Sequence, residues 1–101
     1  MTFAPLLLSE RLQLTDLAAR RCRDLLALFW RILAIEALVM VQGMDLALRE
    51  GESLTAFADS SQQLYAQVRE TVPFLATDRP LSWEIEHLAA LLQKESAATT
   101  I

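Results

Sequence analysis

The chain has 101 residues, of which 53% are apolar, and a formal net charge of −4 at pH 7. This length suits one small domain, which we place over residues 1–101. The negative charge argues against nucleic acid as a partner, because phosphate binding needs a basic excess. The single cysteine, Cys22, excludes an internal disulfide and suits a reducing compartment.

The first eight residues lack the features of a secretory signal. They contain no basic segment, only a short apolar run and no small-residue cleavage site. We therefore expect a cytoplasmic protein.

Strand-like alternation is absent from the sequence, and only two glycines and three prolines interrupt it. We therefore expect an all-α fold. The first helix should begin between Ser9 and Asp16, since serine, threonine and aspartate are common N-caps. It should run to about Arg49 and stop at Gly51.

Two shorter helices should follow. Ser53 or Thr55 is the expected cap of the second, which should end before Val72 because the next residue is proline. A loop over residues 73–80 should then lead to a third helix capped by Ser82. We expect that helix to fade near Lys94 and the tail, residues 96–101, to be frayed.

The first helix is apolar in nearly every direction from residue 25 to residue 48. Such helices are buried on all sides or span a membrane. Arg31 and Glu36 lie near the middle of the run, and each would cost about 2.5–3.5 kcal/mol in a bilayer. We therefore expect no membrane contact and a largely buried helix. Because two short helices cannot surround it, we expect packing into a helical bundle with other chains.

We identify no catalytic, cofactor-binding or metal-binding residue. His87, the only histidine, should lie at the surface beside an acid such as Glu84, with no third ligand for a metal. Cys22 should be an unreactive helix residue next to a solvated basic cluster of Arg20, Arg21 and Arg23. Gly43, inside the long helix, should mark a close helix–helix crossing.

Two stretches carry a family resemblance. ILAIE (32–36) is followed by QGMDL (42–46), and VRETVPFLATDRPL (68–81) leads into EIE (84–86). In this order they resemble the C-terminal helical segment of the histidine and phenylalanine (aromatic amino acid) ammonia-lyases, over about residues 31–90. The resemblance implies a helical bundle within an oligomer. It also implies structural roles for Asp78, which can cap backbone amides, and Arg79, which can bind a carboxylate.

The catalytic features of that family are missing. The Ala-Ser-Gly triad that forms its electrophile does not occur here, and the chain has no asparagine. We therefore expect a non-catalytic oligomerisation or interaction module without a cofactor, as a homo-oligomer or with a longer lyase-like chain. One alternative is a truncated or split component of an active ammonia-lyase or aminomutase, a carbon–nitrogen lyase. A second is an unrelated helical adaptor.

Overall fold

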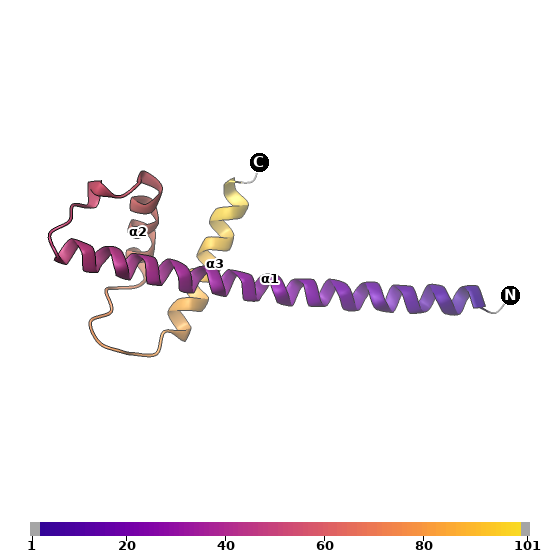
Figure 1. The fold of residues 1–101 in the computed structure, drawn as a ribbon. Helices are drawn as coiled ribbons and strands as arrows, with labels where there is room; N and C mark the ends of the chain where they lie inside the picture. Colours follow the sequence, from indigo (N-terminus) through magenta and orange to yellow (C-terminus); the bar gives the residue numbers. More distant parts are fainter. Residues whose placement is uncertain (1–2, 100–101) are drawn as a thin grey trace.

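The computed structural model describes residues 3–99, with side chains from residue 7 to residue 98. Its elements are the long helix α1 (Phe3–Arg49), the short 3-10 helix η1 (Leu54–Ala56), α2 (Asp59–Thr71) and α3 (Ser82–Thr99). The described residues form no strand, as the all-α prediction requires. Figure 1 shows α1 as a rod whose N-terminal half projects far beyond the other helices. The molecule measures 76 × 34 × 17 Å.

The long helix begins earlier than predicted, at Phe3 rather than between Ser9 and Asp16. Nothing from residue 6 to residue 15 breaks a helix, and leucine, glutamate, arginine and glutamine all favour one. Thr15 does not act as a cap: its hydroxyl donates to the carbonyl of Arg11 at 2.8 Å, one turn back along the helix.

The end of α1 agrees with the sequence. Gly51 has a φ of +105°, a conformation that suits glycine. The N–H of Glu52 then bonds the carbonyl of Ala47 at 3.1 Å, which is the six-residue closure typical of a glycine-terminated helix.

The second helix begins later than predicted, at Asp59 after Ala58. Ser53 caps η1 instead: its hydroxyl oxygen accepts from the N–H of Thr55. The capping residues predicted for α2 at positions 53–55 therefore start the short 3-10 helix η1 instead. The end of α2 is as predicted, since Val72 has an extended backbone and precedes Pro73.

The third helix also differs at its ends. Ser82 is its first residue rather than its cap, and the N–H of Ile85 already bonds the carbonyl of Leu81 at 2.8 Å. The helix continues past Lys94 to Thr99, because the segment after Lys94 is free of glycine and proline. Residues 100 and 101 lie outside the described part, and fraying of the tail stays a prediction.

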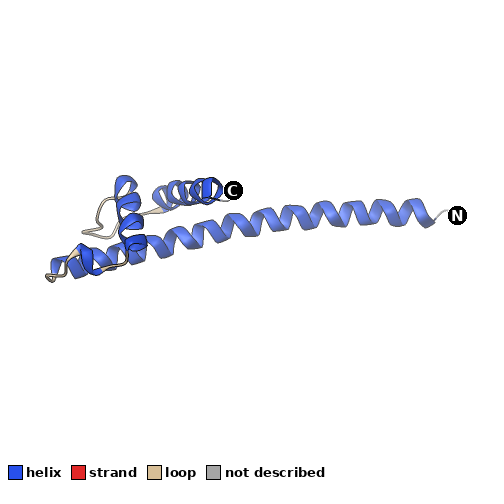
Figure 2. Ribbon diagram, turned by 90° about the horizontal axis from the view of Figure 1, so that it is seen from above, coloured by secondary structure: helices blue, strands red, loops and turns tan. Residues whose placement is uncertain are grey.

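One apolar core joins the three helices beside the C-terminal half of α1. Ala34, Val41, Val68 and Leu88 are fully buried within it. The small side chain of Ala34 allows α2 and α3 to approach α1 closely. Figures 1 and 2 agree that both shorter helices lie at this end of the rod.

Much of α1 is exposed within a single chain. Every side chain from residue 7 to residue 29 is exposed, including Leu12 and Leu25. The two short helices cover only the face that carries the core. Packing with other chains therefore remains a proposal. In the described part of the chain, no helix is long and apolar enough to cross a bilayer.

Ala34→Glu tests this core. A carboxylate at a fully buried contact should lower the free energy of unfolding by about 3 kcal/mol or more, because the charge has no partner there. Urea unfolding followed by circular dichroism measures the loss. Ala19→Glu on the exposed part of α1 is the matched control and should change stability by less than about 0.5 kcal/mol. Equal losses in both variants would contradict the packing described.

Candidate functional site

A polar network lies where the C-terminal end of α1 meets α2. Arg69 donates from Nε to Oδ2 of Asp45 at 2.8 Å, and the Tyr65 hydroxyl donates to Oδ1 of Asp45 at 2.6 Å. The side chains of Asp45 and Arg69 are each only 15% exposed. The Asp45 carboxylate is thus held by Tyr65 at one oxygen and by Arg69 at the other, and it joins α1 to α2.

Gln42, one turn before Asp45, holds the loop that follows α2. Its side-chain amide donates to the carbonyl of Leu75 at 2.9 Å, and its carbonyl oxygen accepts from the Leu75 N–H at 3.3 Å. Arg69 adds hydrogen bonds to Oε1 of Gln42 and to the carbonyl of Val72. The side chains of the QGMDL and VRETVP stretches therefore meet in one network. Both stretches carry the family resemblance, but sequence pattern alone indicates no role for Gln42, Asp45 and Arg69.

The network has no group free for acid–base chemistry. The hydrogen bond to Asp45 raises the pKa of Tyr65 above its ordinary value of 10.0, and burial and the Asp45 charge act in the same direction. Tyr65 therefore stays a neutral donor at physiological pH, whereas a tyrosine that acts as a base needs a lowered pKa. The arrangement stabilises the fold and fixes the loop.

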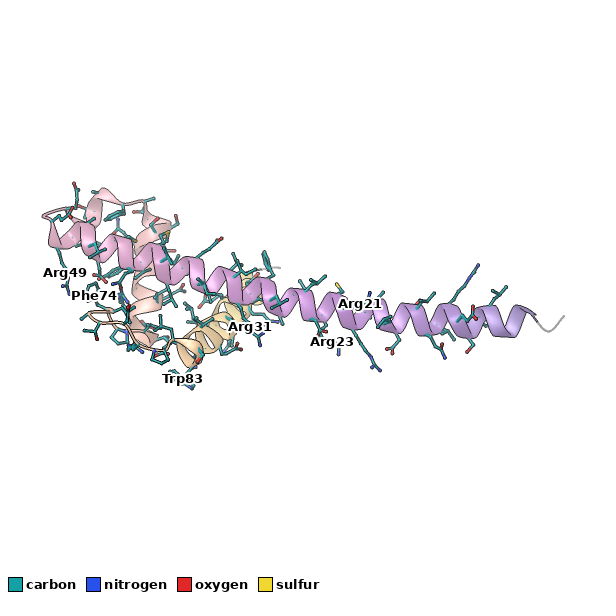
Figure 3. All side chains as sticks on the ribbon, turned by 60° about the horizontal axis from the view of Figure 1, so that its bottom comes forward. Arg21, Arg23, Arg31, Arg49, Phe74 and Trp83 are labelled. Carbon is teal, nitrogen blue, oxygen red and sulfur yellow. The ribbon has the colours of Figure 1, made fainter. Side chains whose placement is uncertain are left out.

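Arg49 and Phe74 stack against each other at the C-terminal end of α1. The guanidinium of Arg49 lies 3.7 Å from the centre of the Phe74 ring, as Figure 3 shows at the C-terminal end of α1. This cation–π contact holds the loop next to the helix end, where a positive charge also suits the helix dipole.

An open groove of about 360 Å³ lies beside the network, between α1 and the loop. Its walls are largely apolar, with Val39 and Leu46 on the α1 side and Pro73 and Leu81 on the loop side. Gly43 forms part of the floor, and beyond its chain neighbours and the nearby backbone of its own helix no atom lies within 4 Å of the place where its Cβ would be. The predicted close helix crossing at Gly43 is therefore wrong within one chain, because α2 and α3 pack on another face of α1.

Of the two loop residues with predicted structural roles, Arg79 makes its expected contact and Asp78 does not. Arg79 forms an ion pair with Glu84, which confirms its predicted bond to a carboxylate. The hydrogen bond from Arg79 lowers the pKa of Glu84 below its ordinary value. Asp78 makes no hydrogen bond in the described part of the chain, so the predicted cap is wrong there. Its side chain is exposed and solvated instead.

His87 is at the surface, as predicted, but it does not pair with an acid. It stacks on Trp83, with ring centres 5.1 Å apart and planes 18° from parallel. The neighbouring acids are already used: Glu84 bonds Arg79, and Glu86 bonds Arg31 at 2.6 Å. Among the described residues, no three metal-binding side chains gather.

The basic cluster is solvated, as predicted. Arg20 pairs with Asp16 at 3.0 Å one turn away, and both are well exposed. Arg21 and Arg23 lie on the projecting part of α1 (Figure 3). Cys22 is a free, exposed thiol on the same segment.

Comparison with known proteins identifies several relatives. The chain is 33% identical to a histidine ammonia-lyase of Bacillus velezensis over 87 residues, which are 86% of this chain and 16% of that protein. It is 40% identical to a tyrosine ammonia-lyase of Cereibacter sphaeroides over 83 residues, 82% of this chain and 16% of that protein. A tyrosine ammonia-lyase of Cupriavidus metallidurans is 38% identical over 78 residues, 77% of this chain and 14% of that protein.

These alignments confirm the predicted resemblance and argue against an unrelated adaptor. They extend beyond the predicted stretch of residues 31–90. The chain spans about a sixth of the length of these relatives. No family model matches the chain, and no solved structure matches it.

Arg69→Met tests the network. It leaves the Asp45 carboxylate without its cation, so the free energy of unfolding should fall by about 2 kcal/mol in urea titrations. Arg69→Lys should recover only part of this loss, because lysine cannot bind Asp45, Gln42 and Val72 together. Arg23→Met, at an exposed position, is the matched control and should be neutral. Full stability of Arg69→Met would contradict the role given to the pair.

Alkaline pH tests the Tyr65–Asp45 bond. Because the pKa of Tyr65 is raised in the folded chain, its stabilising effect is complete below pH 10 and is lost as the pH rises through the folded value. Tyr65→Phe should cost about 1 kcal/mol at pH 7 and flatten this alkaline fall. Thermal unfolding between pH 8 and pH 11.5 measures both effects, and identical profiles for the two proteins would contradict the assignment.

Proposed function

We propose that this chain, which is homologous to a segment of the ammonia-lyases, is a helical assembly module with no catalytic group of its own. The observation that carries the proposal is the long apolar surface of α1 that the chain leaves uncovered. Leu25 is 65% exposed and Val39 is 67% exposed. They lie about 20 Å apart along the helix, so the exposed apolar surface is at least that long. A surface this long and apolar is typical of a helix that packs against other chains.

The lack of a catalytic set supports a structural role. The chain contains no Ala-Ser-Gly triad and no asparagine. Its partly buried polar groups hold one another: Asp45 accepts from Tyr65 and Arg69, and Gln42 binds the loop. These contacts order the C-terminal end of α1 and shape the groove beside Gly43.

The partner is a second copy of the chain or a longer lyase-like chain. The resemblance to the C-terminal part of the ammonia-lyases supports either, since that part helps to build a helical bundle in an oligomer. The main alternative is a split or truncated component of an active ammonia-lyase or aminomutase. In that case a longer chain supplies the electrophile and carries out elimination of ammonia. The net charge of −4 argues against nucleic acid, and the expected compartment is the cytoplasm.

Native mass spectrometry of the tagged chain, purified from its own host, tests the proposal. A homo-oligomer at a fixed multiple of 11.3 kDa supports the module, and so does a complex with a longer chain. An absorbing, borohydride-sensitive centre in such a complex would favour the lyase-component alternative, and the isolated chain should lack it. A monomer at every concentration, without a co-purifying chain, would contradict the proposal.

A further inference from the structure

The exposed apolar residues of α1 form a regular line. Alternating steps of three and four residues connect Leu25, Leu28, Ile32, Ile35 and Val39, and Leu46 follows seven residues later, with the polar Gln42 at the position between. The six apolar residues are all at least 45% exposed. We call this line the outer seam. Such spacing is the pattern by which two helices wind around each other in a coiled coil.

The outer seam lies opposite the face that α2 and α3 cover. The chain's own core uses Ala34, Ala37, Val41 and Met44, which also follow steps of three and four. At 3.6 residues per turn, this set points to the other side of the helix from the outer seam. The helix therefore carries two separate apolar faces, and one chain covers only one of them.

The N-terminal half of α1 carries the seam onward. Counted back from Leu25, the same steps reach Ala18, Leu14 and Leu7, all exposed, and also pass through Arg21 and Arg11. Within the described chain, no other helix supports this half. A helix in water without packing is marginal, so an exposed stretch with this pattern points to a partner of similar length.

We propose that the outer seam binds the outer seam of a second copy, with the two α1 helices antiparallel; this rests on the proposed function and names the partner for it. Each unsupported N-terminal half then lies along the C-terminal half of the other copy. The register places Leu7 opposite Leu46 of the second copy, so the two 47-residue helices overlap almost end to end. Leu14 then faces Val39, and Leu25 faces Leu28.

One flank of the seam carries an opposite-charge pair in this register, and the same flank places Glu10 opposite Asp45, whose carboxylate is already paired with Arg69. Asp24 of one copy lies opposite Arg31 of the other, and symmetry forms the pair twice. Asp24 has no ion pair in the described part of its own chain, and Arg31 contacts Glu86 through Nε. Leu17 faces Leu38, another apolar residue. Opposite charges at flanking positions are what sets partner and orientation in helix pairs.

The groove beside Gly43 receives a side chain in this arrangement. Leu8 of the second copy lies opposite Gly43, over the place where a Cβ would meet no atom within 4 Å beyond its chain neighbours and the nearby backbone of its own helix. The apolar groove walls, Val39, Leu46 and Pro73, surround it. The glycine that has no function in one chain thus becomes the floor of a socket for Leu8.

A parallel pair fits less well. It places Arg21 directly against Arg21 of the second copy within the seam, where like charges repel. In the antiparallel register Arg21 faces Ile32 instead, where its aliphatic stem covers apolar surface and its guanidinium reaches water.

Distance measurements between spin labels test orientation and register. Gln13 is exposed and lies off the seam, so Gln13→Cys in a Cys22→Ser background carries one label per chain. The antiparallel register predicts about 40 Å between the two backbones at this position. A parallel pair predicts less than about 20 Å, and a shift of one heptad changes the antiparallel distance by about 10 Å. Either result would overturn the arrangement.

A matched pair of substitutions tests the surface. Leu25→Asp should weaken self-association by roughly 100-fold or more in analytical ultracentrifugation, because each dimer buries two unpaired carboxylates. Leu26→Asp changes the adjacent exposed leucine, which points away from the seam, and should leave the dimer intact. Both variants should keep the cooperative urea unfolding of the core that α2 and α3 form with α1. Unchanged association of Leu25→Asp, or dissociation by Leu26→Asp alone, would overturn the proposal.

The two proposals fail differently. If the chain is monomeric by itself but forms a complex with a longer chain, pairing of the outer seams is wrong and the assembly module stands. If it forms neither, both are wrong.

Discussion

The ion pair between Asp45 and Arg69 is the interaction on which the rest of the tertiary structure depends. It is mostly buried, it ties α2 to the end of α1, and through Arg69 and Gln42 it also fixes the loop that leads to α3. The shared core of Ala34, Val68 and Leu88 is small, so apolar burial alone leaves these elements poorly specified. The polar network and the apolar core together set which face of α1 they cover.

That choice of face decides what the molecule offers to other chains. Because α2 and α3 cover the side of α1 that holds Ala34 and Val41, the side with Leu25 and Val39 stays open. The loop held by Gln42 also forms the wall of the groove beside Gly43. The same contacts that complete the fold of one chain therefore shape the surface through which we propose it assembles.

Sequence reasoning recovered the three helices and the family because helix breakers and apolar periodicity are local signals. Gly51 and Pro73 end their helices as predicted. The first residue of each helix was less predictable. A possible N-cap such as Ser9 is also tolerated inside a helix, so its presence does not show where the helix begins. The network was missed for a similar reason: Asp45 and Arg69 are 24 positions apart, and their pairing depends on how α2 packs against α1.

The sequence by itself determined that the chain is helical, that α1 carries more apolar surface than two short helices can cover, and that it is related to the ammonia-lyases. These conclusions need only local propensity, composition and motif order. Tertiary structure alone decided which apolar face stays open, that Gly43 lies at an open groove rather than at a crossing, and that His87 stacks on Trp83. The reason is physical: a helix pattern gives the directions of side chains, while the packing of distant segments selects which of those directions remain exposed.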